Sequence, residues 1–343
     1  MPRRPAVRVR GRHVPPRRSR ARRQAAQGLS GSEVFIGLDL GGTNVRAVVA
    51  LPDGASWTIL GDASRATPRG PGDEVVAALV ATAGEALAEA DRRRHDVVAV
   101  GCAAPGPLDH RTGVVHVAPN VPGLLEFPLA ERLASAFDGL PAFVDRDTAI
   151  AAIGEATVGA ATGAHDFVYL TVSTGVGGAI VAGGRMVRGA TGTAGEVGHL
   201  PVAFDQTKRC GCGSFGCVEA FAGGANLGAA YGTADAEDVY RAADRGEERA
   251  RALIADSERA LASLAIGLTN VLNPELIVVG GAIAEHQPAH VLEPMRRAVL
   301  ERAFAVPGRA VRIVPAALGA DVGMIGAVIA ARERTAGAGG WYA

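Results

Sequence analysis

The sequence predicts an α/β protein built as two lobes with a cleft between them. One observation is a device that occurs twice, at residues 38–46 and 171–181: an apolar strand, a glycine-rich turn and a second strand. Another is that apolar strands alternate with segments of helical periodicity, which is typical of α/β architecture. With 343 residues, 48% of them hydrophobic, the chain can form one large domain or two medium-sized ones with ample cores.

The first lobe is expected to span residues 33–145. It begins with the strand VFIGLDLG, a Gly-Gly-Thr turn and the strand VRAVVAL, which ends at a Pro-Asp-Gly turn. The elements expected to follow are a helix over 75–91, a strand over 97–102, a strand pair near 113–117, a helix over 129–137 and a strand over 142–145.

The second lobe is expected to span residues 146–321. A helical segment (TAIAAIGEATVG) leads to the strand FVYLTVS, the turn TGVGG and the strand AIVAGG. A helix over 248–272, the strand LIVVGG and a C-terminal helix over 322–334 follow, and we expect that last helix to complete the first lobe. Two lobes that each open on a glycine-turn hairpin are typical of the actin- and hexokinase-like (RNase H-like) fold, which binds nucleotide in its cleft.

Cysteine usage and hydropathy indicate a cytoplasmic protein. Three of the four Cys fall in one short cluster and leave Cys102 alone, so no disulfide framework is predicted. No apolar run approaches the roughly 18 residues of a membrane span, and no signal-peptide core follows the basic N-terminus.

The first 32 residues are predicted to be a disordered Arg/Pro-rich tail. Residues 1–30 hold ten of the 35 basic residues and no acid, so the rest of the chain has 25 basic and 35 acidic residues. A polyanion-binding arm, a transit-like segment and translated upstream sequence are alternative readings of the tail. The acidic body argues against nucleic acid as the main partner.

Glycine turns at strand ends predict phosphate-binding loops. The first turn lies between two strands, so it is neither a Rossmann turn nor a P-loop, and the only Lys of the chain, Lys208, follows no glycine. Glycines let backbone N–H groups approach phosphate oxygens, and Asp39 is placed to hold Mg²⁺ through water. The predicted phosphate residues are Gly41, Gly42, Thr43, Thr174, Gly175, Gly177, Gly280 and Gly281.

A one-His, three-Cys set predicts a zinc site in the segment GEVGHLPVAFDQTKRCGCGSFGCVE. The set has the ligand types of a closed tetrahedral site and comprises His199, Cys210, Cys212 and Cys217. Glu196 and Glu219 bracket it, and a helical turn at 196–199 would place Glu196 and His199 on one face. Such a metal would make a polar pocket for a hydroxyl-rich ligand rigid. The alternative is a zinc ribbon that serves only as a structural staple.

The chain resembles the ROK family (repressors, open reading frames and sugar kinases). DLGGTN, AAPGPLD, TGVGG, GEVGH and CxCGxxGCxE occur in the family's order between about residues 34 and 331. The resemblance is to the zinc-containing, glucokinase-like sugar kinase branch. It implies ATP-dependent transfer to the primary hydroxyl of a hexose held between the lobes, and assembly as a dimer or tetramer.

The resemblance also assigns individual residues. Asp147 falls at the position of the family's catalytic aspartate, which would accept the proton of the attacking hydroxyl; by itself it could equally be a helix N-cap. Sugar-hydroxyl contacts correspond to Glu196, His199 and Glu219, with His199 binding zinc through one ring nitrogen and a hydroxyl through the other. The residues that fall in loops closing over the sugar are Gly106 and Asn120.

Two positions depart from the family pattern and argue against simple glucose specificity. Family kinases usually read Glu-Asn-Asp-Ala-Asn where this chain reads DRDTA, so Arg146 replaces an amide that both donates and accepts hydrogen bonds. Arg146 either pairs with Asp145 or another acid, or binds an acceptor group that glucose lacks, such as a carbonyl. Leu124 stands where an aromatic residue often follows the Asn-x-Pro-Gly loop.

Three functional alternatives remain beside a hexose kinase. One is a kinase for a modified sugar or for the 7-hydroxyl of a C7 cyclitol in secondary metabolism, whereas Arg146 would repel a cationic amino sugar. Another is a sugar-responsive repressor, which needs a winged helix-turn-helix that the Pro/Arg-rich N-terminus does not resemble. The last is a catalytically weak sugar-binding protein in which Arg146 has spoiled the site.

Overall fold

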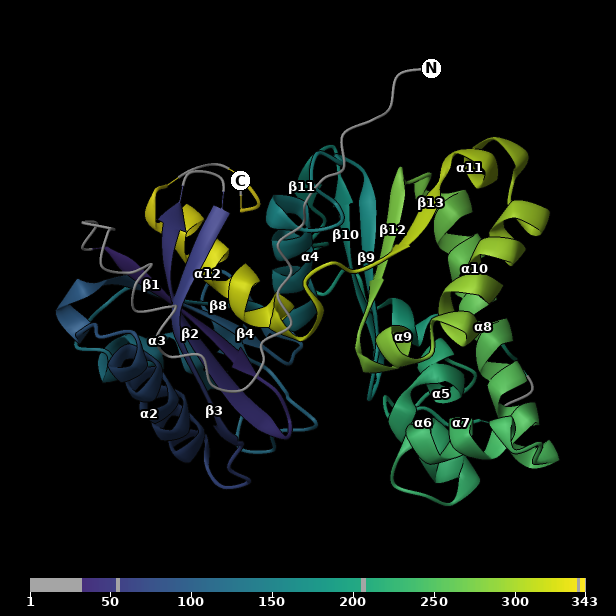
Figure 1. Ribbon diagram of the computed structural model, residues 1–343, viewed down its shortest axis with the longest axis horizontal. Helices are drawn as coiled ribbons and strands as arrows, with labels where there is room; N and C mark the ends of the chain where they lie inside the picture. Colours follow the sequence, from purple (N-terminus) through teal and green to yellow (C-terminus); the bar gives the residue numbers. More distant parts are fainter. Residues whose placement is uncertain (1–32, 54–55, 205–207, 338–339, 343) are drawn as a thin grey trace.

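The computed structural model describes residues 33–53, 56–204, 208–337 and 340–342, which form two α/β lobes lying side by side (Figure 1). The predicted two-lobed α/β fold is confirmed. The predicted disordered tail, residues 1–32, lies outside the described residues.

A five-stranded mixed sheet forms the centre of the first lobe. Its elements are β1 (Val34–Leu40), β2 (Asn44–Asp53), β3 (Ser56–Ala66), α2 (Gly72–Glu89), η1 (Arg94–Asp96), β4 (Val97–Ala104), β5 (Leu108–Asp109), β6 (Val114–Val115), β7 (Phe127–Pro128), α3 (Leu129–Ala136) and β8 (Ala142–Arg146). The strand order is β3-β2-β1-β4-β8, with β1 antiparallel to β2 and parallel to β4, which is parallel to β8. Helices α2 and α3 cover one face with apolar side chains.

Strand β3 was not predicted from the sequence, and β5 and β7 extend the predicted strand pair into a small sheet of three. β3 is an edge strand that pairs only with β2 among the described strands, and its sequence SWTILGDASRA lacks a continuous apolar run. Within it, Gly61 lies against the backbone of Ala86 and Ala90, so a Cβ there would collide with the end of α2. The strand is therefore stabilised by pairing and by close helix packing, which residue hydrophobicity does not reveal.

The second lobe repeats this sheet order with a larger helical layer. Its elements are α4 (Asp147–Val158), β9 (Phe167–Val172), β10 (Val176–Ala182), β11 (Arg185–Met186), η2 (Val197–His199), α5 (Val218–Ala222), α6 (Gly224–Tyr231), α7 (Ala236–Asp244), α8 (Glu248–Leu272), β12 (Leu276–Gly280), α9 (Ala282–His286), α10 (Pro288–Arg302), α11 (Ala305–Ala310), β13 (Arg312–Pro315) and η3 (Gly319–Asp321). The strand order is β11-β10-β9-β12-β13, again an antiparallel hairpin followed by parallel strands. Of the helices in this lobe, the sequence predicted only α4 and α8.

Two helices between the sheets bring the lobes together. The C-terminal helix α12 (Val322–Thr335) packs on β1 and β4 of the first sheet and also against α4 (Figure 1). A Cβ on Gly326 of α12 would collide with the carbonyl of Ile150 in α4, so the two helices are in close contact at this point. Both begin at the cleft, which places Asp147 and Val322 there. The division into residues 33–145 with 322–334 and residues 146–321 stays a prediction.

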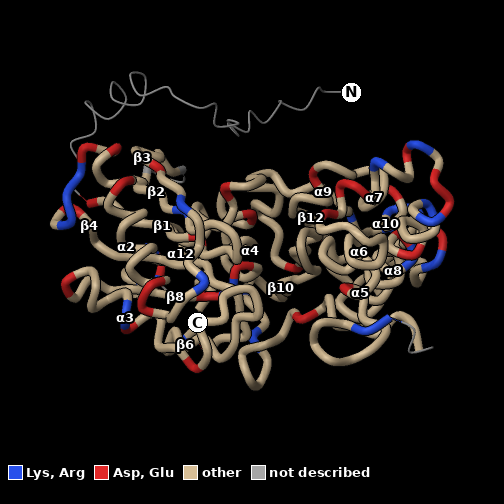
Figure 2. The backbone as a smooth tube through the Cα atoms, turned by 90° about the horizontal axis from the view of Figure 1, so that it is seen from below, with Lys and Arg blue, Asp and Glu red and all other residues tan. Residues whose placement is uncertain are grey.

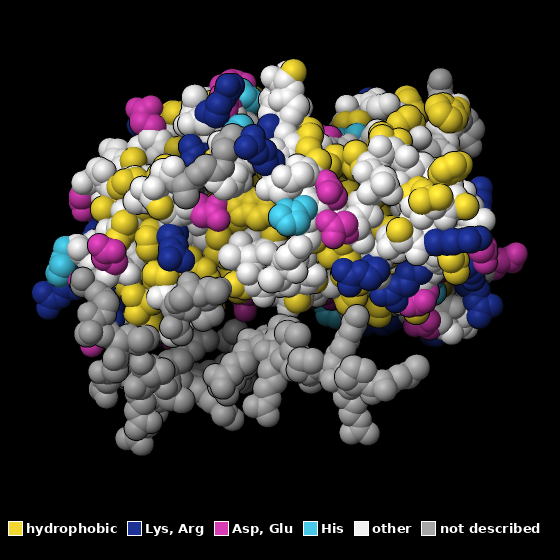
Figure 3. All heavy atoms as spheres, turned by 90° about the horizontal axis from the view of Figure 1, so that it is seen from above, with side chains coloured by type: hydrophobic (Ala, Val, Ile, Leu, Met, Phe, Trp, Pro, Cys, Tyr) yellow, Lys and Arg dark blue, Asp and Glu magenta, His cyan; other side chains and the backbone are white. Residues whose placement is uncertain are grey.

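Charged residues of both signs are spread along the described chain. Lys and Arg intermingle with Asp and Glu over both lobes (Figure 2). Hydrophobic side chains reach the surface of the second lobe (Figure 3). Leu300 in α10, Phe304 just before α11 and Val306 in α11 are exposed. No helix among the described residues is long and apolar enough to cross a membrane.

Candidate active site

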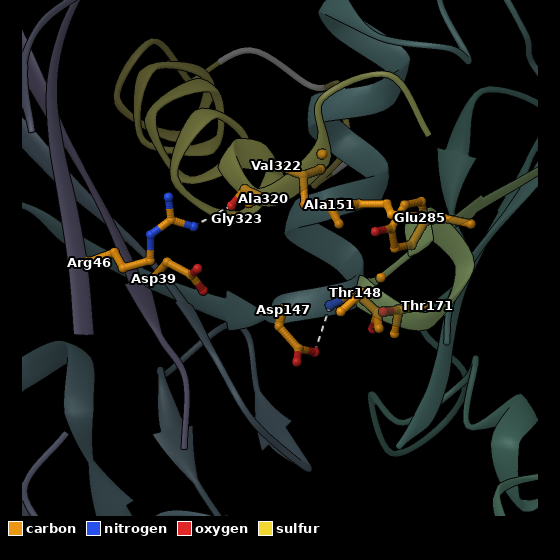
Figure 4. A pocket seen from close by; sticks show the side chains of 14 residues that line it. Asp39, Arg46, Asp147, Thr148, Ala151, Thr171, Glu285, Ala320, Val322 and Gly323 are labelled. Carbon is orange, nitrogen blue, oxygen red and sulfur yellow. Dashed lines mark hydrogen bonds between the residues drawn. The ribbon is translucent and has the colours of Figure 1, made fainter. Parts of the chain in front are cut away.

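A cleft of about 290 Å³ lies where both lobes and both central helices meet (Figure 4). Its walls come from the ends of β1 and β2 with the adjoining 319–323 segment, from the start of α4, and from β9 and α9. The lining residues are Asp39, Arg46, Asp147, Thr148, Ala151, Tyr169, Thr171, Gly281, Ala282, Glu285, Gly319, Ala320, Val322 and Gly323. Of the residues predicted from the sequence, Asp39, Asp147 and Gly281 line this cleft.

Asp147 is the first residue of α4 and points into the cleft (Figure 4). Its Oδ1 accepts a hydrogen bond from the backbone N–H of Thr148, the next residue of α4, at 2.7 Å. Desolvation by the surrounding protein raises the pKa of Asp147, although the Thr148 N–H and the charge of Arg146 act to lower it. A carboxylate with a raised pKa is a better proton acceptor than an exposed one.

Asp39 and Arg46 face each other across the hairpin of β1 and β2. The register pairs them directly, and both side chains reach the cleft. Burial raises the pKa of Asp39 to about 6, with Arg46 lowering it and Asp147 raising it. Arg46 also donates to Asp321 at 2.9 Å and to the carbonyl of Ala320. Arg46 was not predicted from the sequence, although the hairpin register identifies it as the cross-strand partner of Asp39.

Glu155 of α4, which was not predicted from the sequence, holds one wall of the cleft in place by hydrogen bonds to the backbone. It is fully buried and accepts hydrogen bonds from the backbone N–H groups of Ala317 and Leu318, both at 2.9 Å, and from Ala160 at 2.6 Å. These bonds hold the segment that leads to Gly319 and Ala320 in the cleft wall. Several N–H donors on one carboxylate fix a loop that has no regular structure of its own.

The predicted glycine loops are distributed around the cleft. Gly281 has φ of +93° and lines it, while Gly280 lies against the hydroxyl of Tyr169. The other predicted phosphate residues, Gly41, Gly42, Thr43, Thr174, Gly175 and Gly177, are not among its lining residues. A Cβ on Gly42 would come within 2.7 Å of the Asn120 side chain, so the first glycine turn contacts the predicted sugar loop.

Arg146 and Glu196 form an ion pair beside Asp147. Arg146 Nη1 donates to Glu196 Oε1 at 2.7 Å, and Nη2 donates to the carbonyl of Ala194. The stem of Arg146 runs under Gly106, where a Cβ would lie 3.2 Å from its Cγ. Of the alternatives given for Arg146, the one observed is an ion pair with an acid other than Asp145, namely Glu196.

The other departure, Leu124, is buried in the core of the first lobe. It does not line the cleft, and neither do the predicted sugar-contact residues Gly106, Asn120, Arg146, Glu196, His199 and Glu219.

The His/Cys set predicted to bind zinc comes together in the second lobe. One ligand atom from each of His199, Cys210, Cys212 and Cys217 lies within 4.8 Å of the others. His199 Nδ1 is 3.5 Å from Cys210 Sγ, and Cys212 Sγ is 3.8 Å from Cys217 Sγ. With metal–sulfur bonds of about 2.3 Å and metal–nitrogen bonds of about 2.0 Å, a tetrahedral site needs roughly these separations. The residues therefore fit a tetrahedral zinc ion.

Two acids connect this cluster to its surroundings. Glu196 precedes the one-turn helix η2, and its Oε2 is 4.0 Å from His199 Nε2, the ring nitrogen that does not face Cys210. Glu219 Oε2 accepts from the backbone N–H of Val176 at 3.0 Å, while Oε1 lies 3.7 Å from Cys210 Sγ. Glu219 thus joins the metal cluster to the second glycine turn, which the sequence analysis did not anticipate.

Comparison with known proteins identifies the family. The model for the ROK family matches residues 35–334. A glucokinase of Halalkalibacterium halodurans is 31% identical, covering 85% of this chain and 93% of the relative. An N-acetylmannosamine kinase of Escherichia coli O9:H4 is 33% identical, covering 87% of this chain and 98% of the relative. The structure of a Streptomyces griseus ROK glucokinase in complex with glucose and AMPPNP aligns with a TM-score of 0.73 and 29% identity. The alignment covers 88% of this chain and 99% of the glucokinase chain. The chain belongs to the ROK family.

Proposed function

We propose that this protein transfers a phosphoryl group from ATP to the primary hydroxyl of a hexose or hexose-like polyol. The observation that carries the proposal is the position of Asp147, which faces the cleft between Asp39 and Arg46 on one lobe and Thr148 and Thr171 on the other. Membership of a family with glucokinase and N-acetylmannosamine kinase relatives supports the same reaction.

Asp147 is assigned as the general base. Phosphoryl transfer depends mainly on positioning and charge stabilisation, with one carboxylate to accept the proton of the attacking hydroxyl. The raised pKa of Asp147 and its fixed bond to the Thr148 N–H suit that role. The nucleotide phosphates are assigned to the end of the cleft at Gly281 and Gly323, with Asp39 as the residue that holds Mg²⁺ through water.

The acceptor is assigned to the side of Asp147 that faces Arg146, Glu196 and His199. Bound zinc would fix the orientation of His199, so that Nε2 is presented to a substrate hydroxyl. Gly106 and Asn120 are assigned to the loops around the acceptor. The cytoplasmic location and the assembly as a dimer or tetramer stay predictions, the latter in keeping with the exposed apolar residues of α10 and α11.

The test is ADP release by zinc-loaded protein with Mg-ATP and a panel of hexoses. Asp147→Ala should lower kcat by about 10²–10⁴-fold while the Kd for ATP stays within about threefold. Asp73→Ala, which removes an exposed carboxylate of α2, is the matched control and should leave kcat unchanged. An Asp147→Ala enzyme with kcat within tenfold of the parent would contradict the assignment.

A catalytically weak sugar-binding protein is the second candidate, because the Glu196 carboxylate already pairs with Arg146. That candidate predicts calorimetric binding of a sugar without ADP release. ADP release that depends on an acceptor would exclude it.

A further inference from the structure

The carboxylate of Asp145, two residues before Asp147, is the centre of a buried set of contacts. Its side chain is 2% exposed, and Oδ1 accepts a hydrogen bond from the backbone N–H of Arg146 at 2.8 Å. Arg188 binds the same carboxylate twice, from Nη1 to Oδ1 at 2.9 Å and from Nη2 to Oδ2 at 2.7 Å. A bidentate guanidinium–carboxylate pair has a defined geometry. Asp145 therefore holds both the backbone at the end of β8 and the guanidinium of Arg188.

Arg188 begins the loop 188–196, which ends at Glu196, one of the residues assigned to the acceptor. The carbonyl of Arg188 accepts from the backbone N–H of Ala194 at 3.0 Å, which closes the loop on itself. The carbonyl of Ala194 accepts from the Arg146 guanidinium, and Glu196 pairs with the same group. The loop is thus tied at both of its ends to the two residues that precede Asp147. A shift of Arg188 would move the loop relative to Asp147.

Tyr342, near the C-terminus, covers the pair of Arg188 and Asp145. The Cζ atom of Arg188 lies 5.3 Å from the centroid of the Tyr342 ring. Burial and the charge of the Asp145 carboxylate raise the pKa of the Tyr342 hydroxyl, and Arg188 acts to lower it. An aromatic face attracts a guanidinium, and more strongly where water is excluded. The Tyr342 ring therefore helps to keep Arg188 on Asp145.

The same ring contacts the first lobe. It stacks on His110, in the turn between β5 and β6, with the ring centroids 6.3 Å apart and an interplanar angle of 27°. The Cζ atom of Arg334, in α12, lies 4.7 Å from the Tyr342 centroid, and Arg334 Nη1 donates to the carbonyl of His110 at 2.6 Å. One aromatic ring thus joins a turn of the first lobe, the C-terminal helix and an arginine of the second lobe.

The residue before it anchors this part of the chain to the body. Trp341 packs with Tyr342 against the apolar cluster that includes Ile150 of α4. Burial raises the pKa of Glu333, in α12, and hydrogen bonds from Trp341 act to lower it. Both aromatic residues lie beyond residues 35–334, which match the family model, so family membership does not account for their position.

We infer that Tyr342 is a positioning residue for the phosphoryl transfer proposed above. The ring holds the pair of Arg188 and Asp145, and that pair holds the loop 188–196 against the start of α4. The acceptor is thereby kept in place relative to Asp147. Tyr342 is not among the residues that line the cleft, so it acts through Arg188 and not by touching the reactants. The inference rests on the proposed kinase function and adds a residue to it.

The experiment measures kcat and both KM values with zinc-loaded full-length protein, Mg-ATP and the hexose that the parent phosphorylates best. Tyr342→Ala should lower kcat/KM for the acceptor about tenfold or more, because small misplacements of reacting groups are costly, while the KM for ATP stays within about twofold. Tyr342→Phe keeps the ring, so its kcat/KM should stay within about threefold of the parental value. A general loss of stability would not separate the two KM values in this way.

A double-mutant cycle tests whether Tyr342 acts through Arg188. Arg188→Lys keeps the charge but not the bidentate geometry, so it should show the same selective loss. Tyr342→Ala combined with Arg188→Lys should cost no more than about threefold beyond Arg188→Lys alone, because the two residues belong to one network. Tyr231→Ala is the matched control. It removes a tyrosine that also covers an arginine, Arg249, but lies outside the cleft lining, and it should keep the parental values.

Thermal unfolding shows whether each variant folds. If Tyr342→Ala does not, Tyr342→Leu keeps the apolar bulk without the aromatic face and should show the same selective loss. A kcat/KM for the acceptor within about threefold of the parent, equal changes in both KM values, or full additivity in the cycle overturns the inference while the kinase function stands. No ADP release by the parent with any hexose overturns the proposed function, and the inference with it.

Discussion

The part of the cleft around Gly281 and Gly323, which we assign to the phosphates, is shaped by glycines, whereas the Arg146–Glu196 region beside Asp147, which we assign to the acceptor, presents charged side chains held by other side chains. At the first end a Cβ on Gly323 would lie 2.8 Å from the Asp39 carboxyl, so a side chain there would displace it. At the second, each charged group depends on a partner that is distant in sequence. Backbone N–H groups can bind phosphate whatever the side chains are, and phosphate is the same in every nucleotide. Pairs of charged side chains can be changed by substitution to fit a particular acceptor.

The largest effect is expected from adding one carbon at the phosphate end. Gly281 has φ of +93°, and its Cβ would lie 2.6 Å from both Thr171 Oγ1 and the carbonyl of Val172. Gly281→Ala should therefore lower the unfolding free energy by about 1–3 kcal/mol and raise the KM for ATP about tenfold or more. Chemical denaturation and initial rates at varied ATP measure the two effects.

Gly84→Ala is the control for this change. Gly84 lies in α2 with no atom within 4 Å of an added Cβ, so alanine should stabilise the helix by about 0.5–1 kcal/mol. An unchanged KM for ATP in Gly281→Ala would mean that the nucleotide does not approach this turn.

Removal of zinc should act on the acceptor end alone. Chelation, or Cys212→Ser, frees His199 and loosens the segment up to Glu219. The KM for the acceptor should rise about tenfold, whereas the KM for ATP should change less than threefold. Cys102→Ala is the control, since Cys102 is buried in the first lobe, outside the cluster. Equal changes in both KM values would show that the two ends are not separable in this way.

An effect on stability without any change in the acceptor end is expected from Asp39 in the protein without nucleotide and metal. Its pKa is raised to about 6 by burial, so the folded protein binds this proton more tightly than the unfolded chain does. Above about pH 6 the buried Asp39 carboxyl is ionised, and its full destabilising effect on the fold is present. The effect decreases as the pH falls toward 3.8, the ordinary pKa of an aspartate.

Asp39→Asn should remove this penalty. The variant should gain at most about 3 kcal/mol of unfolding free energy at pH 8 and about half of that at pH 5. Urea unfolding across this range measures the gain, with Asp73→Asn as an exposed control. A gain that is independent of pH would exclude the ionisation of Asp39 as its cause.

Part of the candidate site could be predicted from the sequence, namely Asp39, Asp147, Gly281 and the His/Cys set, because these residues lie in local motifs. The glycine turns, the GEVGH segment and the three cysteines each fall within a few residues of one another, and turn or metal chemistry restricts the residue types allowed there. Arg46 and Glu155 were missed because their partners, Asp321 and the 317–318 backbone, are far away in the chain. Strand β3 was missed because an edge strand gains its stability from pairing and not from apolar content.

The sequence was enough to predict the two-lobed α/β fold, the family and the residues that could bind a metal ion, since local spacing constrains each of them. Only the tertiary structure decided how Arg146 is used. The residue chemistry allowed it to pair with Asp145, to pair with another acid or to face the substrate. In the structure Arg188, 43 residues from Asp145, pairs with both oxygens of that acid, and Arg146 pairs with Glu196. Which charged groups pair depends on which of them the fold places next to each other. Spacing along the sequence does not reveal that.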